Sequence, residues 1–397
     1  MRPTSLAGLD KGMQFRKIAV MTGTRAEYGL MSWLIDELCH SDHFVLQLVV
    51  SGMHLSPLFG HTVSKIIADG YEIAAEVPCV GLDDSPIGMI ADFSEACSGF
   101  GRAFETLKPD ILVLLGDRYE ALAAACAATM LRIPIAHIHG GEATEGAMDE
   151  AFRHSITKMA HLHFPAAEDY ARRIVRMGED PERVHMVGAI GLDSFTRLDL
   201  MPRPALAAEF DLDTEKPWVL VTFHPATLEE ADAAEQTKVL VAALDRHQEA
   251  VLMVTKANSD PGGRAVNQVW ENQAAANPDR VRLFDSLGQT RYLSAMKQAA
   301  AVVGNSSSGI IEAPAAGVPT VNIGSRQAGR LMADTILHAR VDANEISTAL
   351  ERALSGEKIG GAHTPPYGKP NDATGKILKV LGGNHHDNLL IKKFYEM

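Results

Sequence analysis

The sequence predicts an α/β protein made of two Rossmann-like domains. Its 397 residues are too many for one ordinary core and suit two domains of this size. From about Lys17 onward, short apolar segments alternate with longer segments of helical periodicity. The short segments are almost continuously apolar, which is typical of strands buried on both faces of a parallel sheet. We therefore expect right-handed strand–helix–strand units in each half, with the carboxyl ends of both sheets facing a central cleft.

The first half contains five candidate strands separated by helical segments. The strands are expected at Lys17–Met21, Phe44–Ser51, Asp110–Leu115, Ile133–Ile138 and Val184–Val187. The helices are expected at Tyr28–Cys39, Met89–Leu107, Glu120–Leu131 and Asp149–Ala160. This order predicts a first domain over residues 1–195.

The second half repeats the pattern after a proline-marked linker, which is expected around Gly191–Pro217. Its strands are expected at Trp218–Phe223, Ala250–Val254, Val281–Phe284, Ala301–Val303 and Pro319–Ile323. The order predicts a second domain over residues 196–365. A final helix, Asp372–Leu381, is expected within a segment, 366–397, that packs back on the first domain.

Composition excludes several classes of protein. The formal net charge of −13 at pH 7 argues against a nucleic-acid partner held by phosphate contacts. The cysteines lie far apart with no Cys-x-x-Cys pair, as is typical of reduced thiols. Residues 1–15 lack an apolar segment of signal-peptide length, and no apolar run is long enough to cross a bilayer. We therefore expect a cytoplasmic protein with no membrane partner.

The segment Ala301–Glu312 has the composition of a phosphate-binding loop. It runs from a strand through Gly304-Asn-Ser-Ser-Ser-Gly309 into a helix that is expected to begin near Ser307. The amide of Asn305, the hydroxyl groups of Ser306, Ser307 and Ser308, and the unpaired N–H groups of a helix start suit an anion. The alternative is an elaborate helix cap, because Ser and Asn often cap helices. Glu312, one turn into the helix, either accepts hydrogen bonds from a ribose or faces water.

Arginines follow two other strands. Arg326 and Arg330 lie in a glycine-spaced loop and suit a phosphate clamp, although surface arginines are common. Arg25 lies in Thr22-Gly-Thr-Arg-Ala-Glu-Tyr-Gly29, after the first strand. This loop lacks the Gly-x-Gly-x-x-Gly spacing, so it disfavours a dinucleotide, and we expect no cofactor.

Titratable side chains gather after two strands of the first half. Asp117 and Arg118 end one strand, where Asp117 is either a helix cap or a catalytic group. The next strand leads through His139 to Glu142, Asp149, Glu150 and Arg153. Carboxylates on two sides of a substrate are what proton transfer needs. In the second half His224 and Pro225 follow a strand, and Asn258 and Asp260 follow the next one, where turn chemistry is the alternative.

Several histidines raise the alternative of a zinc site. His137 and His139 are expected to point the same way along one strand, with His161 and His163 nearby in the sequence. A catalytic zinc needs three converging ligands, and no convincing third ligand is present. The favoured interpretation is a histidine at the end of a strand that holds a loop by hydrogen bonds, so no metal is expected.

These motifs together resemble the hydrolysing UDP-N-acetylglucosamine 2-epimerases, in particular the bacterial branch that makes N-acetylmannosamine for sialic-acid-type sugars. The similarity runs from about Lys17 to Arg330, in the family's order. The matching motifs are Thr22-Gly-Thr-Arg-Ala-Glu-Tyr, Gly116-Asp-Arg, His137-Ile-His-Gly-Gly-Glu, Arg153-His-Ser-Ile-Thr-Lys, Phe223-His-Pro, Gly304-Asn-Ser-Ser-Ser-Gly and Gly324-Ser-Arg-Gln-Ala-Gly-Arg.

The resemblance implies the GT-B arrangement of two Rossmann domains and a homodimer or homotetramer. It also implies anti elimination of UDP from UDP-N-acetylglucosamine to give 2-acetamidoglucal, followed by hydration to N-acetylmannosamine. The same branch contains enzymes that act on UDP-2,4-diacetamido sugars such as UDP-N,N'-diacetylbacillosamine, so the 4-substituent stays open. The motifs are also compatible with a GT-B glycosyltransferase or with a non-catalytic nucleotide-sugar sensor.

The resemblance also implies roles for single residues. Asp117, Glu142 and Asp149 resemble the acid–base carboxylates, and His224 resembles the group beside the departing phosphate. The residues that resemble UDP or pocket ligands are Arg25, Ser306, Ser307, Glu312, Arg326, Asn258 and Asp260. The remaining residues expected to bind substrate are Arg118, His139, Glu150, Arg153 and Arg330. Several relatives carry Glu where this chain has His139, so the proton role there must pass to Glu142 or be shared.

Overall fold

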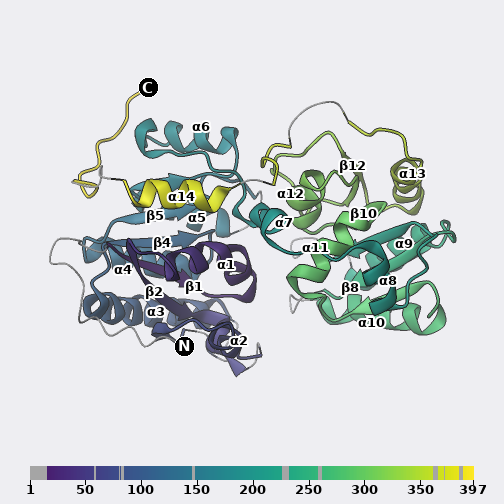
Figure 1. Ribbon diagram of the computed structural model, residues 1–397, viewed down its shortest axis with the longest axis horizontal. Coiled ribbons are helices and arrows are strands. Elements are labelled where there is room, and N and C mark those ends of the chain that lie inside the picture. Colours follow the sequence, from purple (N-terminus) through teal and green to yellow (C-terminus); the bar gives the residue numbers. More distant parts are fainter. Residues whose placement is uncertain are drawn as a thin grey trace. The chain divides into compact units, whose positions relative to one another are not determined.

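The computed structural model describes residues 16–57, 60–79, 81, 85–144, 148–225, 232–257, 262–360, 365–370, 372–383 and 388–397. The chain forms two compact units. Unit 1 comprises Met1–Gly141, Ala151–Val187 and Thr374–Met397, and unit 2 comprises Glu142–Glu150 and Gly188–Ala373. Each unit contains one parallel sheet, six-stranded within the described residues, with helices packed on it (Figure 1). The fold is therefore α/β with two Rossmann-like units.

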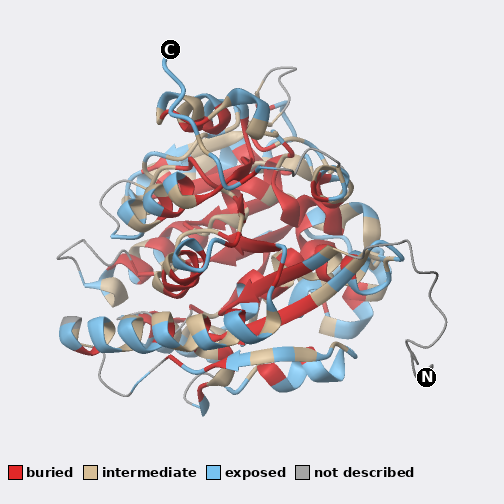
Figure 2. Ribbon diagram, turned by 90° about the vertical axis from the view of Figure 1, so that its left-hand side faces the viewer, coloured by how far each residue is buried: buried red, intermediate tan, exposed pale blue. Residues whose placement is uncertain are grey.

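The sheet of unit 1 has the strand order β3-β2-β1-β4-β5-β6. Its strands are β1 Arg16–Thr22, β2 Phe44–Ser51, β3 Ile73–Val77, β4 Ile111–Leu115, β5 Ile135–Ile138 and β6 Leu162–Phe164. The order reverses between β1 and β4, which is the switch point where α/β sheets usually bind ligands. The central strands are buried while the surrounding helices carry exposed residues (Figure 2).

The prediction of a strand at Val184–Val187 is wrong. That segment contributes only an isolated bridge between His163 and Val184, and the sheet instead ends in β6, only three residues long. Strand β3 was also not expected. Its alternating burial reflects its position at the edge of the sheet, where one face meets solvent.

The helices of unit 1 are α1 Arg25–Cys39, α2 Val63–Ala68, α3 Pro86–Leu107, α4 Tyr119–Met130, α5 Asp149–Met159, α6 Glu168–Arg176 and α14 Ala373–Leu381. Side-chain caps start α1 and α3, whereas α2, α4 and α6 begin without one. Thr24 accepts a hydrogen bond from Glu27 N at the start of α1, and Ser85 accepts one from Gly88 N at the start of α3. Helix α4 is rich in alanine and packs closely on α3 in the apolar core. No described helix is long and apolar enough to span a bilayer.

The sheet of unit 2 has the strand order β12-β11-β10-β7-β8-β9. The strands are β7 Trp218–Thr222, β8 Val251–Thr255, β9 Val281–Phe284, β10 Ala301–Gly304, β11 Thr320–Ile323 and β12 Ile336–Ala339. The five strands expected here are confirmed, and β12 is an additional edge strand. The helices are α7 Ser194–Arg197, α8 Arg203–Phe210, α9 Ala233–Leu244, α10 Gly263–Ala276, α11 Gly288–Gln298, α12 Ser308–Ala315 and α13 Ala343–Leu354.

The segment expected to be a linker is part of the packed structure. It contains α7 and α8, and Leu206 and Leu212 are buried in the same apolar cluster as Trp218. Two prolines therefore mark the start of α8 and not an extended connection, since proline suits the first turn of a helix.

Candidate functional site

The loop after β4 presents a carboxylate that is bound by a buried guanidinium. Asp117 follows Gly116, which has a positive φ of 78°. Arg153 of α5 is 2% exposed, and its Nη2 forms an ion pair with Asp117 Oδ2. Because a buried guanidinium has little freedom, the pair fixes the orientation of the carboxylate. Asp117 itself remains partly accessible, with its side chain 27% exposed.

His137, on strand β5, forms a hydrogen bond to this loop. Its Nε2 lies 2.7 Å from Gly116 O and its Nδ1 lies 3.2 Å from Thr157 Oγ1. Burial lowers the pKa of His137 to about 3, so the ring is neutral. A carbonyl only accepts, so Nε2 carries the proton, while the Thr157 hydroxyl beside Nδ1 donates to Arg153 O at 2.9 Å. The interpretation of a strand-end histidine that holds a loop is confirmed for His137.

His161 and His163, in the same region, also form hydrogen bonds. His161 Nδ1 accepts from Ile135 N at 3.1 Å, and His163 Nε2 lies 3.1 Å from Glu179 Oε2. Burial lowers the pKa of both rings. Across the described ranges, no group of three or more His, Cys, Asp or Glu is arranged to hold a metal ion.

The prediction that His139 continues the strand beside His137 is wrong. Strand β5 ends at Ile138, and His139 has a left-handed backbone with φ of 63°. Its N–H donates to Phe164 O at 3.1 Å. The two histidines therefore do not share the alternation of a strand, because the chain turns between them.

The segment that follows, Glu142–Glu150, groups with unit 2. Glu142 is 3% exposed and accepts a hydrogen bond from Arg330 Nη1 at 3.3 Å. Glu150 Oε2 accepts from Thr144 N at 2.7 Å, while Asp149 is exposed at the start of α5. Arg330 and Glu142, expected to serve the substrate separately, thus form an ion pair.

A second ionic cluster joins the loops after β1 and β4. Arg118 binds Glu120 through two hydrogen bonds of 3.1 and 3.0 Å, and its Nε lies 4.0 Å from Glu27 Oε1. Glu27 Oε2 accepts from Gly23 N at 2.7 Å. Burial and the neighbouring Glu120 raise the pKa of Glu27 to about 7. Burial lowers the pKa of Arg118, but the neighbouring Glu120 and Glu27 together offset this effect, and the pKa is raised.

The two arginines of these loops therefore differ in surroundings. Arg25, the first residue of α1, is exposed, while the guanidinium of Arg118 is bound to carboxylates. The Arg118 side chain is nevertheless 37% exposed, so both arginines reach solvent.

The expected phosphate loop of unit 2 is a tight turn between β10 and α12. Gly304 has φ of 137°, and a Cβ there would lie 1.9 Å from Thr222 O. Helix α12 begins at Ser308, as expected, with Ser307 as its N-cap residue. The Ser307 side chain forms no capping hydrogen bond, but Ser306 Oγ accepts from Ser308 N at 3.4 Å, so a serine of this loop does cap the helix start. Glu312 lies on the second turn of α12 and is half-buried.

Several side-chain hydroxyl groups in and next to this loop form hydrogen bonds with one another. Tyr292 OH lies 2.6 Å from Ser308 Oγ, which lies 3.1 Å from Ser306 Oγ. Thr222 and Thr255, at the ends of β7 and β8, share a hydrogen bond of 2.7 Å. His224 is held through its main chain by the Asn305 side chain, and Arg326 Nη1 donates to Asn305 O. Tyr292 and the threonines were not expected from the sequence as parts of the site, whereas Asn305 was expected there as an amide donor.

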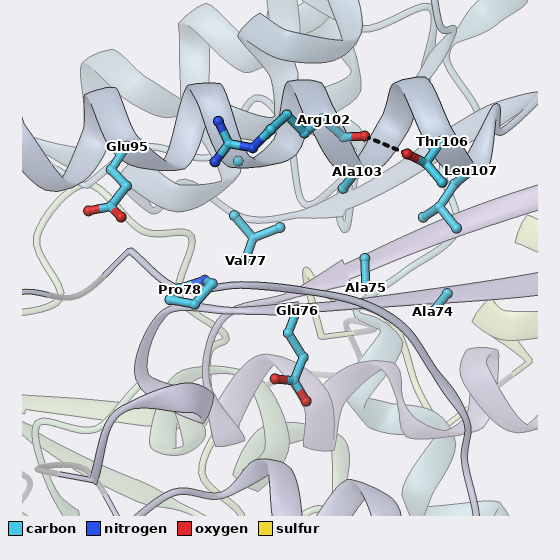
Figure 3. Close-up of a pocket in the computed structure, with 11 residues that line it drawn as sticks. Ala74, Ala75, Glu76, Val77, Pro78, Glu95, Arg102, Ala103, Thr106 and Leu107 are labelled. Atoms are coloured by element: carbon cyan, nitrogen blue, oxygen red, sulfur yellow. Dashed lines mark hydrogen bonds between the residues drawn. The ribbon is translucent and has the colours of Figure 1, made fainter.

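Asn258 and Asp260 lie outside the described residues. The remaining expected residues cluster at the carboxyl ends of the strands within their own units. A separate hollow of about 320 Å³ in unit 1 lies between the edge strand β3 and helix α3 (Figure 3). None of the expected site residues lines it; the lining residues are Ala74, Ala75, Glu76, Val77, Pro78, Glu95, Gly99, Arg102, Ala103, Thr106 and Leu107.

Two Rossmann-like units with ligand-type residues at their strand ends define a protein of the GT-B class. A sequence model of the family described as UDP-N-acetylglucosamine 2-epimerase matches residues 36–382, and the chain belongs to this family. The chain is 37% identical over 387 residues to a GDP/UDP-N,N'-diacetylbacillosamine 2-epimerase (hydrolyzing) of Campylobacter jejuni, covering 97% of this chain and 100% of the relative.

Two further comparisons agree. A UDP-N,N'-diacetylbacillosamine 2-epimerase (hydrolyzing) of Legionella pneumophila is 36% identical over 368 residues, covering 92% of this chain and 96% of that protein. The fold is similar to the crystal structure of UDP-GlcNAc 2-epimerase from Neisseria meningitidis bound to UDP-GlcNAc, with a TM-score of 0.77. That match covers 92% of this chain and 99% of the other at 17% identity, and it supports the fold alone.

Proposed function

We propose that this protein is a hydrolysing 2-epimerase that releases UDP from a UDP-linked 2-acetamido sugar and inverts its C2. The observation that carries the proposal is the Asp117 carboxylate, held by the buried Arg153 at the end of β4. An accessible carboxylate of fixed orientation is what proton transfer requires, whereas nucleotide binding alone does not need it. Family membership supports the same chemistry.

The reaction begins with loss of the C2 proton to a carboxylate. The C–H electron pair forms the C1–C2 double bond, and the C1–O bond breaks with its electron pair passing to UDP. Asp117, Glu142 and Asp149 are the proposed acid–base groups, and the Arg330 pair orients Glu142. Water then adds to C1 while a proton is returned to C2 on the other face, which gives the manno configuration.

Charge develops on the departing phosphate as the C1–O bond opens. We assign its stabilisation to Arg25, Arg326, His224 and the hydroxyl groups of Ser306 and Ser307. Donors aimed at developing charge lower the barrier most when they are positioned before the reaction. Glu312, one turn into α12, is assigned to the ribose. Arg118 is better suited to positioning the loops after β1 and β4, because its guanidinium is bound to Glu120.

For the sugar, we propose UDP-N,N'-diacetylbacillosamine as the preferred substrate. Two relatives of 37% and 36% identity over nearly the whole chain carry that activity in their names. UDP-N-acetylglucosamine, the substrate expected from the sequence, is the second candidate. The two substrates share the UDP group and the 2-acetamido group, so the same catalytic residues serve either one.

The experiment is product identification by NMR after incubation with each UDP-sugar in the absence of an acceptor. Release of UDP together with a manno-configured sugar is expected, with the faster turnover on the diacetamido substrate. Asp117→Asn is expected to lower kcat by about 10²–10⁴-fold while UDP still binds. Glu105→Gln, an exposed carboxylate on α3, is the matched control with unchanged kcat.

Two outcomes would overturn the proposal. UDP release only when an acceptor is added would indicate a glycosyltransferase. Tight binding of the UDP-sugar with no turnover, unaffected by Asp117→Asn, would indicate a nucleotide-sugar sensor.

A further inference from the structure

In the loop after β10, Asn305 takes part in five hydrogen bonds through its side chain and main chain. It is 2% exposed. Its side-chain Nδ2 donates to His224 O at 2.8 Å, and its Oδ1 accepts from His224 N at 2.8 Å. Its main-chain N donates to Thr222 O at 3.2 Å. Its carbonyl oxygen accepts from Arg326 Nη1 at 3.2 Å and from Gln327 Nε2 at 2.8 Å.

These hydrogen bonds connect three loops that no sheet pairing connects. The pairing of β10 with β7 ends at Gly304 and Thr222, and its pairing with β11 ends at Gly304 and Asn322. Beyond these points the chains separate. The Asn305 side chain has the donor and acceptor of a peptide group, so it extends the pairing to His224 after the strands have ended.

The local sequence explains why a side chain, and not the main chain, must link the loops after β7 and β10. Pro225 follows His224 and has no N–H, so the main chain cannot continue a ladder there. Gly304 allows the close approach, because any Cβ at that position would lie 1.9 Å from Thr222 O. An aspartate at 305 would lack the donor for His224 O, and a glutamine would be one methylene too long.

We propose that Asn305 is a positioning residue that holds His224, the serine loop and Arg326 in register for the departing UDP. This inference rests on the proposed function, since the three linked loops carry the groups assigned to the leaving phosphate. Asn305 does not itself need to touch the substrate. Its hydrogen bonds set the spacing between groups that do, and a displacement of about 1 Å at such groups can lower a rate by about 10²-fold.

The test measures UDP affinity by calorimetry and kcat by UDP release for Asn305→Ala and the nearly isosteric Asn305→Asp. Both are expected to weaken UDP binding about tenfold and to lower kcat by about 10–100-fold. In a double-mutant cycle, His224→Ala is expected to reduce the effect of Asn305→Ala on kcat, because the two residues act together. A purely structural role for Asn305 would give additive effects.

Two further variants keep the test decisive. Ser294→Ala removes a buried hydroxyl of unit 2 that binds Met201 N and Thr290 O, so it should lower Tm without changing UDP affinity or kcat. If the Asn305 variants fail to fold, Gln327→Met tests the contact between the loops after β10 and β11 instead. It removes the donor to Asn305 O, and a several-fold loss of UDP affinity is expected.

The outcomes separate the two proposals. If wild-type protein binds UDP but releases none from either UDP-sugar, the proposed function fails, and the UDP affinities still test Asn305. If wild-type protein turns over and the folded variants at 305 and 327 keep UDP affinity and kcat within about twofold, the role of Asn305 is wrong.

Discussion

The loops after β1 and β4 in unit 1 and those after β7 and β10 in unit 2 are held by different kinds of interaction. In unit 1 the supports are charged or titratable, namely the Asp117–Arg153 pair, the Arg118–Glu120–Glu27 cluster and the buried His137. In unit 2 most of the supports are neutral, namely the Asn305 amide and the hydroxyls of Tyr292, Ser308 and Thr222, although the Arg326 guanidinium also donates to Asn305 O.

The difference matches the tasks proposed for the two regions. Groups that exchange protons need an electrostatic environment that controls their charge, whereas donors for a phosphate need a fixed position at any pH. Changes in pH or charge should therefore affect unit 1, while changes in shape should affect unit 2. The following predictions test this comparison, beginning with the largest effect.

Gly304→Ala should disrupt unit 2. The added Cβ would lie 1.9 Å from Thr222 O, and the backbone φ of 137° disfavours any other residue. We expect loss of UDP binding and a fall in Tm of more than about 10 °C, measured by calorimetry. Gly317→Ala is the control, since Gly317 has φ of 77° but nothing within 4 Å of the added Cβ, so a cost of only about 1 kcal/mol is expected. Equal effects of the two variants would contradict the steric argument.

Arg153→Met should impair turnover with little effect on UDP binding. It removes the cation that orients Asp117, and a fall in kcat of about 10²-fold is expected from steady-state UDP release. Arg102→Met, an exposed arginine on α3, is the control. The account would be contradicted by unchanged kcat together with weaker UDP binding, because that result would make Arg153 a nucleotide ligand.

Glu27→Gln should remove a pH dependence of stability. Burial raises the pKa of Glu27 from 4.5 to about 7, so the folded protein binds a proton that the unfolded chain has released between these values. The stabilising contribution is present in full below pH 4.5 and is lost as pH rises to about 7. It amounts to at most about 3 kcal/mol. Tm measured from pH 5 to 8 should fall less with pH in the variant, and parallel curves would contradict the prediction.

Lys392→Met should give the smallest effect and leave turnover unchanged. Lys392 Nζ donates to Lys158 O and Ala160 O at 2.7 and 2.6 Å and to Glu179 Oε2 at 2.6 Å. In the variant, Glu179 retains its contacts with Lys158 and His163. The free energy of unfolding is therefore expected to fall by only about 1–2 kcal/mol. The neighbouring exposed Lys393→Met is the control. Equal Tm values for the two variants would show that Lys392 does not anchor the C-terminal segment.

The strands with continuous apolar sequences could be predicted, and those with other patterns could not. β1, β2, β4 and β7 are buried on both faces and read clearly in the sequence. The edge strand β3 alternates in burial, and β6 is three residues long with His163 at its centre, so neither has the expected signal. Val184–Val187 has an apolar composition but makes only one bridge.

The identities of the candidate site residues could be predicted, but most of their partners could not. Position at a strand end indicated Asp117, His224 and Ser306. The pairs between Asp117 and Arg153, and between Glu142 and Arg330, depend on contacts between residues far apart in sequence. Asn305 was visible within the serine-rich turn, but only the structure shows that its amide binds the main chain of His224.

The most direct test of the account is the reaction in deuterium oxide, followed by NMR of the released sugar. We predict UDP and a manno-configured sugar that carries deuterium at C2, because elimination removes the C2 proton and hydration replaces it from solvent. A sugar that retains hydrogen at C2, or that keeps the gluco configuration, would show direct hydrolysis and would contradict the proposed role of the carboxylates.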